Sequence, residues 1–484
     1  METQNYKSFG RFTRAKGILL MLFLIIIGNV LMAQIQSAAS GNWSNSATWV
    51  GGVVPGPADD VVINAAHTIT VDVAATINNF TMNAGVLQGS QSFTATGNFT
   101  QSGGTYNVIG TTDIAGDVTI TGGYFDHGAG NRTINISGNV SMSGGSSYLG
   151  SGSGTGNMTI GGNFTFSGGN LGSSSSSVGP ITVNGTTLIS TGTNKTFQGR
   201  NLIMNGGGSY TATDIFYFGS SNTKITIPSG TTWTVDLSSP KSINNVYGGL
   251  PMIENIGTMQ LNGSSLMNLT GTWDVVLKNA GEVIVNGGEL RMFSTQNEAG
   301  CNYQLAAGST LNFNKGTTTG LHGDMITGAG NWNLIVSGST VNLTGGTFNP
   351  GSYTQSAGSL QGTADVNIAG GATISGGTYN VIGTTDIGGN VTITGGYFDH
   401  GAGNRTVNIG GNVSISGGYL GSGTGTGNMT IDGDFTFSGG NLGSSSLSVG
   451  PITVNGTTLI STGTNKAFQG RNLIMNGGGS YTAT

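Results

Sequence analysis

The segment YFDHGAGNRT, which begins at Tyr124, holds the densest group of side chains capable of acid–base chemistry. Asp126, His127 and Arg132 lie within seven residues. The group recurs as Asp399, His400 and Arg405. An aspartate that orients a histidine is a plausible acid–base pair. A polar corner between two strands is the preferred interpretation, because adjacent Asp126 and His127 would point to opposite faces of a strand.

Other candidate sites in the sequence are sparse. Asp59 and Asp60 follow Pro57 and are a weak Ca²⁺ candidate, since two adjacent carboxylates lack the further oxygen ligands that Ca²⁺ needs. His67 and His322 are isolated. The chain has no Gly-x-Ser-x-Gly elbow, no His-Glu-x-x-His motif and no paired cysteine ligands. We therefore expect no cofactor and no enzymatic activity, and an enzyme is the alternative hypothesis.

The composition limits which protein classes are possible. The chain has 484 residues, of which 90 are glycine and 7% are charged, and its net charge is −5. Glycine at this level excludes helical bundles, and glycine without a three-residue period excludes collagen. A mildly acidic chain without basic clusters is a poor nucleic-acid binder. One cysteine cannot form an internal disulfide, so another kind of interaction must hold the fold together.

Residues 1–33 predict a secretory signal peptide. Basic residues precede the apolar run Ile18 to Ile27, and Ala33 ends the segment. The run is shorter than the roughly 20 residues that a membrane span needs. Cleavage near Ala38 or Ala39 is the alternative. We expect a secreted or cell-surface protein that keeps no transmembrane span after cleavage.

A long internal duplication dominates the rest of the chain. Gly103 to Thr213 recurs as Gly376 to Thr484, with 99 of 109 aligned positions identical and one gap at Ser146 and Ser147. The second copy stops where the first continues into Asp214, so we expect a fragment of a longer protein. The predicted divisions are a cap over 34–77, a first large repeat over 78–350 and a second, truncated one over 351–484.

Shorter repeats within each copy predict the fold. GNFTQSGG, GDVTITGG, GNVSMSGG and GNFTFSGG begin 19, 22 and 24 residues apart. Apolar residues two apart indicate strands, and the Gly-Gly pair supplies a corner. This spacing fits one coil of a parallel β-helix. We expect an all-β, single-stranded parallel β-helix of the right-handed, pectate-lyase-like type, with 19–24 residues per coil, roughly 20 coils and a length on the order of 100 Å.

Two sets of stacked polar residues follow from this fold. Asn98, Asn139 and Asn163 share one coil position, where stacked amides could form a ladder that Asp117 interrupts and Asn390 restores in the copy. A simple turn preference of asparagine is the preferred interpretation of this column.

The second set consists of two columns of outward hydroxyl groups, which resemble the ice-binding faces of β-solenoids. Its members are Thr100/Ser102, Thr119/Thr121, Ser141/Ser143 and Thr165/Ser167, repeated as Thr373/Ser375, Thr392/Thr394, Ser414/Ser416 and Thr436/Ser438. Ice binding is a minor hypothesis, because strand propensity and solubility explain the same residues.

The stretch after the signal resembles a known extracellular module. Its tryptophans, glycines, proline and aspartate follow the order of the β-rich domain named for its eight glycines, as found on Bacteroidota-type surface proteins. The matching residues, within Gly41 to Gly89, are Trp43, Trp49, Gly51, Gly52, Pro55, Asp60, Val62, Ile63 and the strand His67 to Val73. The resemblance implies an extracellular module of a family that binds ligands, and type IX secretion. From the residues alone, we expect Trp43 and Trp49 to cap the first coil.

The remaining coils are similar in composition and rhythm to haemagglutinin and adhesin β-helices. We therefore expect a non-enzymatic structural or adhesin-like protein of the cell surface. The alternative is a carbohydrate-active β-helix, either a lyase, a hydrolase or a glycan-binding module. Tyr124, Phe125, Tyr148 and Tyr106 are candidates for stacking on sugar rings, although some of them must belong to the core. Extracellular glycans or cell-surface components are the expected partners.

Overall fold

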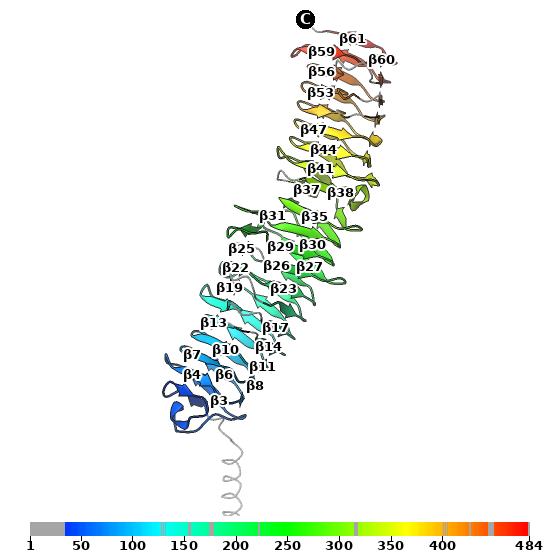
Figure 1. Ribbon diagram of the computed structural model, residues 1–484. Helices are drawn as coiled ribbons and strands as arrows, with labels where there is room; N and C mark the ends of the chain where they lie inside the picture. The colour runs from blue at the N-terminus through cyan, green and yellow to red at the C-terminus, as the bar shows by residue number, and fades with distance from the viewer. Residues whose placement is uncertain are drawn as a thin grey trace, which may run out of the picture.

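The protein is a long β-solenoid (Figure 1), seen in a computed structural model. The residues described are 34–126, 128, 130, 132–152, 156–173, 179–220, 223–313, 318–399, 401, 403, 405–424, 427–443 and 450–482. Parallel strands stack into about 19 turns with essentially no helix, which confirms the all-β parallel solenoid. Within these ranges the helical elements are the 3-10 turns η1 (Ser46–Thr48) and η2 (Gly323–Met325). The same ranges contain no helix long and apolar enough to cross a membrane.

Each coil contributes three strands, and strands at the same position stack into sheets. Sheet 1 has 14 strands. They are β1 (Gln34–Gln36), β3 (Asp60–Ile63), β6 (Phe80–Met82), β9 (Phe99–Gln101), β12 (Val118–Ile120), β15 (Val140–Met142), β18 (Phe164–Phe166), β21 (Thr187–Ile189), β24 (Gly208–Tyr210), β27 (Thr232–Leu237), β30 (Thr258–Gly263), β33 (Glu282–Asn286), β36 (Asn302–Leu305) and β39 (Ile326–Gly328).

Sheet 2 runs along the whole rod. Its strands are β2 (Gly41–Asn42), β4 (Thr68–Val71), β7 (Val86–Gly89), β10 (Thr105–Val108), β13 (Gly123–Phe125), β16 (Ser147–Leu149), β19 (Gly169–Gly172), β22 (Lys195–Gln198), β25 (Phe216–Gly219), β28 (Lys241–Asn245), β31 (Leu266–Gly271), β34 (Glu289–Met292), β37 (Thr310–Phe313), β40 (Asn331–Leu334), β43 (Ser352–Gln355), β46 (Ala372–Ile374), β49 (Val391–Ile393), β52 (Val413–Ile415), β55 (Phe435–Phe437), β58 (Thr458–Ile460) and β61 (Gly479–Tyr481).

Sheet 3 completes the coils of the first half. Its strands are β5 (Ala75–Ile77), β8 (Phe93–Ala95), β11 (Thr112–Ile114), β14 (Thr133–Ile136), β17 (Asn157–Ile160), β20 (Ile181–Val183), β23 (Asn201–Met204), β26 (Lys224–Ile227), β29 (Met252–Asn255), β32 (Val276–Asn279) and β35 (Ser294–Asn297).

Sheets 4 and 5 accompany sheet 2 in the second half. Sheet 4 contains β38 (Thr318–Leu321), β41 (Thr340–Leu343), β44 (Ser359–Gly362), β47 (Thr378–Val381), β50 (Tyr397–Phe398), β53 (Tyr419–Leu420), β56 (Gly440–Gly443) and β59 (Lys466–Gln469). Sheet 5 contains β42 (Thr347–Phe348), β45 (Asp365–Ile368), β48 (Thr385–Ile387), β51 (Thr406–Ile409), β54 (Asn428–Ile431), β57 (Ile452–Val454) and β60 (Leu473–Met475).

The period-two pattern accounts for both the strands and the core. In β12 the apolar Val118 and Ile120 are buried and Thr119 between them is exposed. Such inward columns form one continuous apolar core along the rod. The Gly-Gly corners are tight: a Cβ on Gly122 would lie 2.4 Å from the carbonyl oxygen of Ser102 one coil away, and Gly123 has φ +76°. Stacked corners therefore leave no room for a side chain.

In the middle of the chain, the number of residues per coil extends beyond the expected range of 19–24. Neighbouring coils are 18 residues apart where Val276 pairs with Ser294 and 28 apart where Lys224 pairs with Met252. The longer coils carry loops such as 246–251, which leave the strand positions in register. Extra residues are thus absorbed at the corners, because the hydrogen-bonded ladders hold the strands in place.

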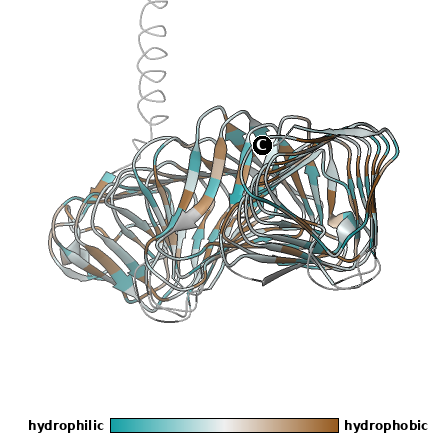
Figure 2. Cartoon of the chain, turned by 90° about the horizontal axis from the view of Figure 1, so that it is seen from above, coloured by the Kyte–Doolittle hydropathy of each residue, from teal (hydrophilic) through white to brown (hydrophobic). Residues whose placement is uncertain are grey.

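The sheets change over between the two halves of the rod. Sheets 1 and 3 end at β39 and β35, and sheets 4 and 5 begin at β38 and β42. Among the described strands, no hydrogen-bonded ladder joins β35 to β38 or β39 to β42. Sheet 2 alone continues through this junction by the pairing of β37 with β40. The rod changes direction at the same level, and the view from above shows its two halves offset (Figures 1 and 2).

The two copies of the long repeat occupy different faces of the solenoid. Val118–Ile120 forms β12 in sheet 1, whereas its copy, Val391–Ile393, forms β49 in sheet 2. β49 is the thirty-seventh strand after β12. Because each coil has three strands, this separation equals twelve coils plus one strand. Each feature of the second copy is therefore displaced by one face relative to the first.

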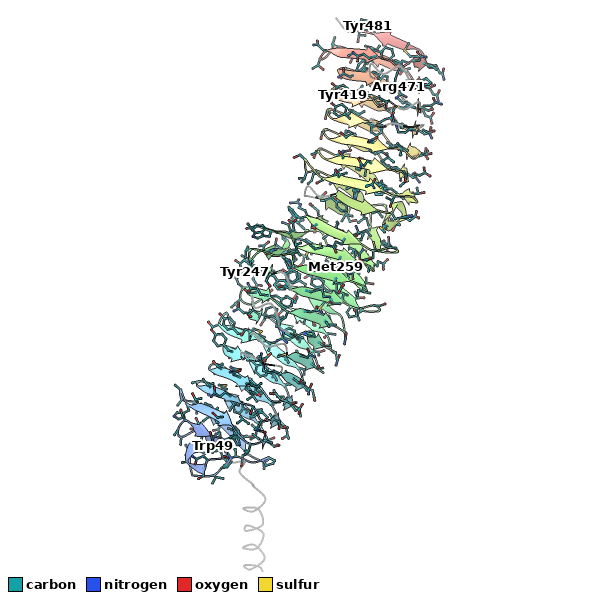
Figure 3. All side chains as sticks on the ribbon, viewed as in Figure 1. Trp49, Tyr247, Met259, Tyr419, Arg471 and Tyr481 are labelled. Carbon is teal, nitrogen blue, oxygen red and sulfur yellow. The ribbon has the colours of Figure 1, made fainter. Side chains whose placement is uncertain are left out.

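The N-terminal stretch 34–77 forms the first coils of the solenoid, since its strands belong to sheets 1, 2 and 3. Trp43 and Trp49 are 1% and 2% exposed, with ring centroids 4.7 Å apart, and Trp49 Nε1 donates to the Trp43 carbonyl at 2.8 Å. Trp49 lies at the N-terminal end of the rod (Figure 3). The backbone of Thr48 to Val50 bonds to that of β1 and the residues after it. The two tryptophans are thus packed into the N-terminal end of the core.

At the other end of the described rod, core positions face solvent. Phe468, Met475 and Tyr481 are 53%, 47% and 71% exposed. Their equivalents in the first copy, Phe197, Met204 and Tyr210, are 0% exposed because the next coil covers them.

Candidate functional site

Asp126 lies directly after β13 in a left-handed conformation with φ 59°. Its side chain is inside the molecule, where only 2% of the residue is exposed. Oδ1 accepts a hydrogen bond from Arg132 Nε, and Oδ2 accepts one from Arg200 Nη1 at 3.1 Å. Both carboxylate oxygens are therefore engaged by buried guanidinium groups.

Arg200 joins this aspartate to several coils. Its Nε donates to the carbonyl of Gly179 at 2.8 Å, and its Nη2 donates to that of Gly156 at 3.0 Å. Nη1 also reaches the carbonyl of Gly150 at 3.3 Å. Burial lowers the pKa of Arg200, and the Asp126 carboxylate opposes that shift. The guanidinium thus fixes the corners of consecutive coils.

The second copy repeats the arrangement. Asp399 has φ 59°, is 4% exposed, and accepts hydrogen bonds from Arg405 Nε and from Arg471 Nη1, the latter at 3.2 Å. Arg471 donates in turn to the carbonyls of Gly421, Gly427 and neighbouring corners. His127 and His400 lie outside the described residues. We call each group, Asp126–Arg132–Arg200 and Asp399–Arg405–Arg471, a buried arginine clamp.

The clamps do not form an accessible acid–base site. A catalytic carboxylate must come within hydrogen-bond reach of its substrate, and Asp126 and Asp399 are enclosed by arginines. The sequence analysis missed Arg200 and Arg471, which lie 74 and 72 residues from their aspartates. Their occurrence as the motif QGR in both copies was the available signal.

Asp59 and Asp60, the Ca²⁺ candidates, both serve as acceptors within the protein. Asp59 Oδ2 accepts from the Gly56 backbone at 2.8 Å, and Asp60 Oδ1 accepts from the side chains of Asn78 and Asn79, each at 2.9 Å. Over the described parts of the chain, no group of three or more His, Cys, Asp or Glu side chains is placed to hold a metal ion.

Asp60 begins a ladder that corrects the interpretation of the asparagine column. Each side-chain oxygen accepts the backbone N–H of the next member one coil on, at 2.7–3.2 Å. The members are Asp60, Asn79, Asn98, Asp117, Asn139, Asn163 and finally Thr186. Asp117 does not interrupt the ladder, because only the acceptor oxygen is needed and aspartate has one. A bare turn preference is therefore the wrong explanation.

The hydroxyl column exists but is short. Thr100 pairs with Thr119, Thr119 with Ser141 and Ser141 with Thr165, and the column then ends at Leu188. The copy ends in the same way at Leu459. Since the copies lie on different sheets, their hydroxyl columns do not share one flat face.

A cavity of about 770 Å³ lies at the junction where β35 and β38 fail to pair. It is lined by Asn297, Cys301, Asn302, His322, Asp324, Met325 and Thr344, among others. His322 Nδ1 lies 3.5 Å from Asp324 Oδ2, so this histidine is not isolated as the sequence suggested. Cys301 is only 3% exposed, and burial raises the pKa of its thiol to about 11. The thiol is therefore a poor nucleophile at neutral pH.

The aromatic candidates divide between core and surface. Tyr106 and Phe125 are 0% exposed and belong to the core. Tyr124 and Tyr148 are half-buried on the outside of sheet 2, with stacked rings whose centroids are 4.4 Å apart. The most exposed aromatic side chains nearby, Tyr247 at 51% and Trp273 at 55%, were not singled out from the sequence.

Comparison with protein-family models, with curated proteins and with solved structures found no match to this chain. The function must therefore be argued from the geometry alone.

Proposed function

We propose that the protein is a secreted, cell-surface rod with a structural or adhesin-like role and without enzymatic turnover. The observation that supports this proposal is that the two aspartates best suited to acid–base chemistry are buried and paired with arginines. Asp126 and Asp399 are 2% and 4% exposed and are held by buried arginines in both copies. Residues used to stabilise corners are not available to a substrate.

The solenoid itself suits such a role. Backbone ladders join each coil only to its neighbours, and the arginine clamps reach three coils along the rod, so length is added without altering a more distant site. The exterior is mainly Thr, Ser, Asn and Gly, which hydrate well but supply few acids, bases or nucleophiles. A carbohydrate-active enzyme is the rival, and it would need accessible carboxylates near the substrate.

Export by a signal peptide is part of the proposal, and the first strand favours one cleavage site. Gln34–Gln36 forms β1, which pairs with β3, and Ile35 is 7% exposed. Cleavage after Ala33 leaves β1 whole, whereas cleavage after Ala38 or Ala39 removes a strand of sheet 1. We expect the mature protein to begin at Gln34, as mass spectrometry of the exported chain would show.

The decisive experiment measures turnover and location together. The exported protein is incubated with a panel of polysaccharides while reducing ends and unsaturated products are assayed, and whole cells are probed with an antibody to the rod. Surface labelling without turnover supports the proposal. Turnover that is lost in Asp126→Asn with Asp399→Asn, in protein that remains folded, would overturn it.

A further inference from the structure

Five aromatic side chains lie on the outside of sheet 2, or on the loops that follow its strands β28 and β31, in the first half of the rod. They are Tyr124, Tyr148, Tyr217, Tyr247 and Trp273. Tyr217 and Tyr247 have ring centroids 6.3 Å apart, and Trp273 Nε1 lies 3.8 Å from the position that a Cβ on Gly248 would occupy. Tyr148 is near enough to be influenced too: burial and then the phenols of Tyr124 and Tyr247 raise its pKa. We call this set the aromatic face; Tyr247 lies midway along the rod (Figure 3).

The loops that carry the two most exposed rings are held at their backbones by a buried asparagine. Asn245, which is 0% exposed, donates from Nδ2 to the carbonyls of Gly249 at 3.3 Å and Asp274 at 2.9 Å. Its Oδ1 accepts from the Tyr247 backbone at 3.3 Å, and its carbonyl accepts from the Trp273 backbone at 3.2 Å. Asn245 therefore fixes the backbones of both loops, which reduces the entropy that a partner must remove from them on binding.

The same loop is supported by a strained residue. Ser220 has φ 76° and, with Asp126 and Asp399, is one of three non-glycine residues with positive φ in the described ranges. Its N–H donates to the carbonyl of Gly248 at 3.0 Å, and its hydroxyl contacts Thr223 Oγ1 at 3.0 Å. Strain of this kind persists where the surroundings enforce it, often at binding sites.

The residues between the rings can form hydrogen bonds and carry no charge. The outward column of sheet 2 runs from Tyr148 to Asn170, then to Thr196 and Tyr217, and on to Asn244. Successive members are one strand spacing apart, about 4.8 Å. Amide and hydroxyl groups thus lie between aromatic rings along the rod axis. This combination matches the apolar faces and hydroxyl edges of pyranose rings, and the absence of charged members disfavours a charged polymer.

We propose that the aromatic face binds a neutral polysaccharide chain lying along the rod. This inference rests on the proposed function and deepens it, since it names the partner of the adhesin-like surface. Tyr247 and Trp273 stack on sugar rings, while Asn170, Thr196 and Asn244 bond to hydroxyl groups. Exposed Trp and Tyr that are fixed in advance are the residues that carry most binding energy at interfaces.

The tryptophans provide a direct signal for binding. All five lie in the described residues, and Trp273 is 55% exposed while Trp43, Trp49, Trp233 and Trp332 are at most 2% exposed. Acrylamide quenching of the intact protein therefore reports mainly on Trp273. We expect hydroxyethyl cellulose, xylan, galactomannan or dextran to protect it from quenching, and polygalacturonate, a charged polymer, to have no effect.

The second copy supplies the matched control. Tyr397 and Tyr419 stack with centroids 4.5 Å apart, as Tyr124 and Tyr148 do, but Ala467 replaces Thr196. We expect the double variant Tyr247→Ala with Trp273→Ala to bind the neutral polysaccharide that protected Trp273 at least tenfold more weakly, as measured by affinity electrophoresis. Tyr397→Ala with Tyr419→Ala should change it less than twofold, and Trp273→Phe should keep most of it.

Several results would overturn the inference. The first is that the intact chain binds none of the four neutral polymers. The second is that the two double variants lose equal amounts of polysaccharide affinity, and the third is that polygalacturonate binds as tightly as a neutral polymer. Because the substituted rings are exposed, unchanged thermal unfolding confirms that each variant is folded. If no polysaccharide binds but cells are labelled and no turnover is found, only the inference on binding fails and the proposed function stands. Turnover that depends on Asp126 and Asp399 would instead contradict the proposed function.

Discussion

Asp126 offsets one of two positive charges in a place that water does not reach. Arg132 and Arg200 are 2% and 1% exposed, so each clamp holds two guanidinium groups and one carboxylate. Both Nη atoms of Arg132 are buried and have no hydrogen-bond partner among the residues that the structure describes. The charge of Asp126 is therefore needed for stability, since without it two buried cations would face each other.

This charge balance gives a prediction for Asp126→Asn. We expect the variant to lose about 3 to 5 kcal/mol of unfolding free energy, because it leaves two buried guanidinium groups uncompensated. The urea midpoint of the first unfolding transition measures the loss. Asp113→Asn is the control, because Asp113 accepts one hydrogen bond from Asn135 at an exposed position and should cost below about 1 kcal/mol. Similar losses in the two variants would contradict the clamp.

Cys301 gives a second prediction at this scale. Its pKa is raised to about 11 in the folded protein, above the roughly 8.5 of an exposed thiol. Because the folded pKa is the higher one, the thiol's contribution to stability is full below about pH 8.5 and is lost as the pH rises toward 11. We expect iodoacetamide at pH 8 to react at least about a hundredfold more slowly with the native protein than with protein in urea. Equal rates would show that the thiol is accessible.

Among the strands and corners, the polar ladder requires a side-chain acceptor oxygen at one coil position, and either aspartate or asparagine can supply it. Asp117 Oδ1 accepts the Asn139 N–H at 2.7 Å, and in the copy Asn390 Oδ1 accepts the Asn412 N–H at 2.8 Å. The two copies thus place different residues in the same role. Alternation of Asp and Asn at one position is a recognisable sign of such a ladder.

Substitutions at Asp117 test this interpretation. Asp117→Asn should change the unfolding free energy by less than about 0.5 kcal/mol, because the acceptor oxygen is retained. Asp117→Ala should cost about 1 kcal/mol, since the Asn139 N–H loses its protein partner. Urea unfolding of both variants measures the difference. If the asparagine variant were as unstable as the alanine variant, the negative charge rather than the acceptor would be the important property.

The strands and corners were predictable because their causes are local. Val118 and Ile120 alternate with Thr119, and Gly-Gly follows within the same coil. The clamp was not predictable, because Arg200 meets Asp126 only after three further coils have stacked. Two members of the aromatic face, Tyr124 and Tyr148, were candidates from the sequence. The other three were missed because Tyr217, Tyr247 and Trp273 belong to successive coils of unequal length, so no sequence period links them.

At the scale of the whole molecule, the stacking of coils sets the length. About 19 turns at about 4.8 Å each give a rod on the order of 90 Å. We expect small-angle X-ray scattering of the mature protein to give a radius of gyration on the order of 25–30 Å, against about 22 Å for a compact domain of this size. A compact value would contradict the extended solenoid.

The face displacement also bears on ice binding. The hydroxyl columns of the two copies lie on sheets 1 and 2, and each ends at a leucine. A planar crystal surface therefore meets only one short column at a time. We expect thermal hysteresis no greater than that of a neutral control protein, and a clear excess would restore the ice-binding hypothesis.

The 37-strand spacing between equivalent strands makes the duplication a screw operation along the rod. One step advances twelve coils and rotates the pattern by one side of a three-sided prism. Repeating this unit would bring a given patch back to its starting side only after three steps. Lengthening the rod in this way spreads identical patches around its circumference, so the molecule gains directions of contact rather than a larger single contact area.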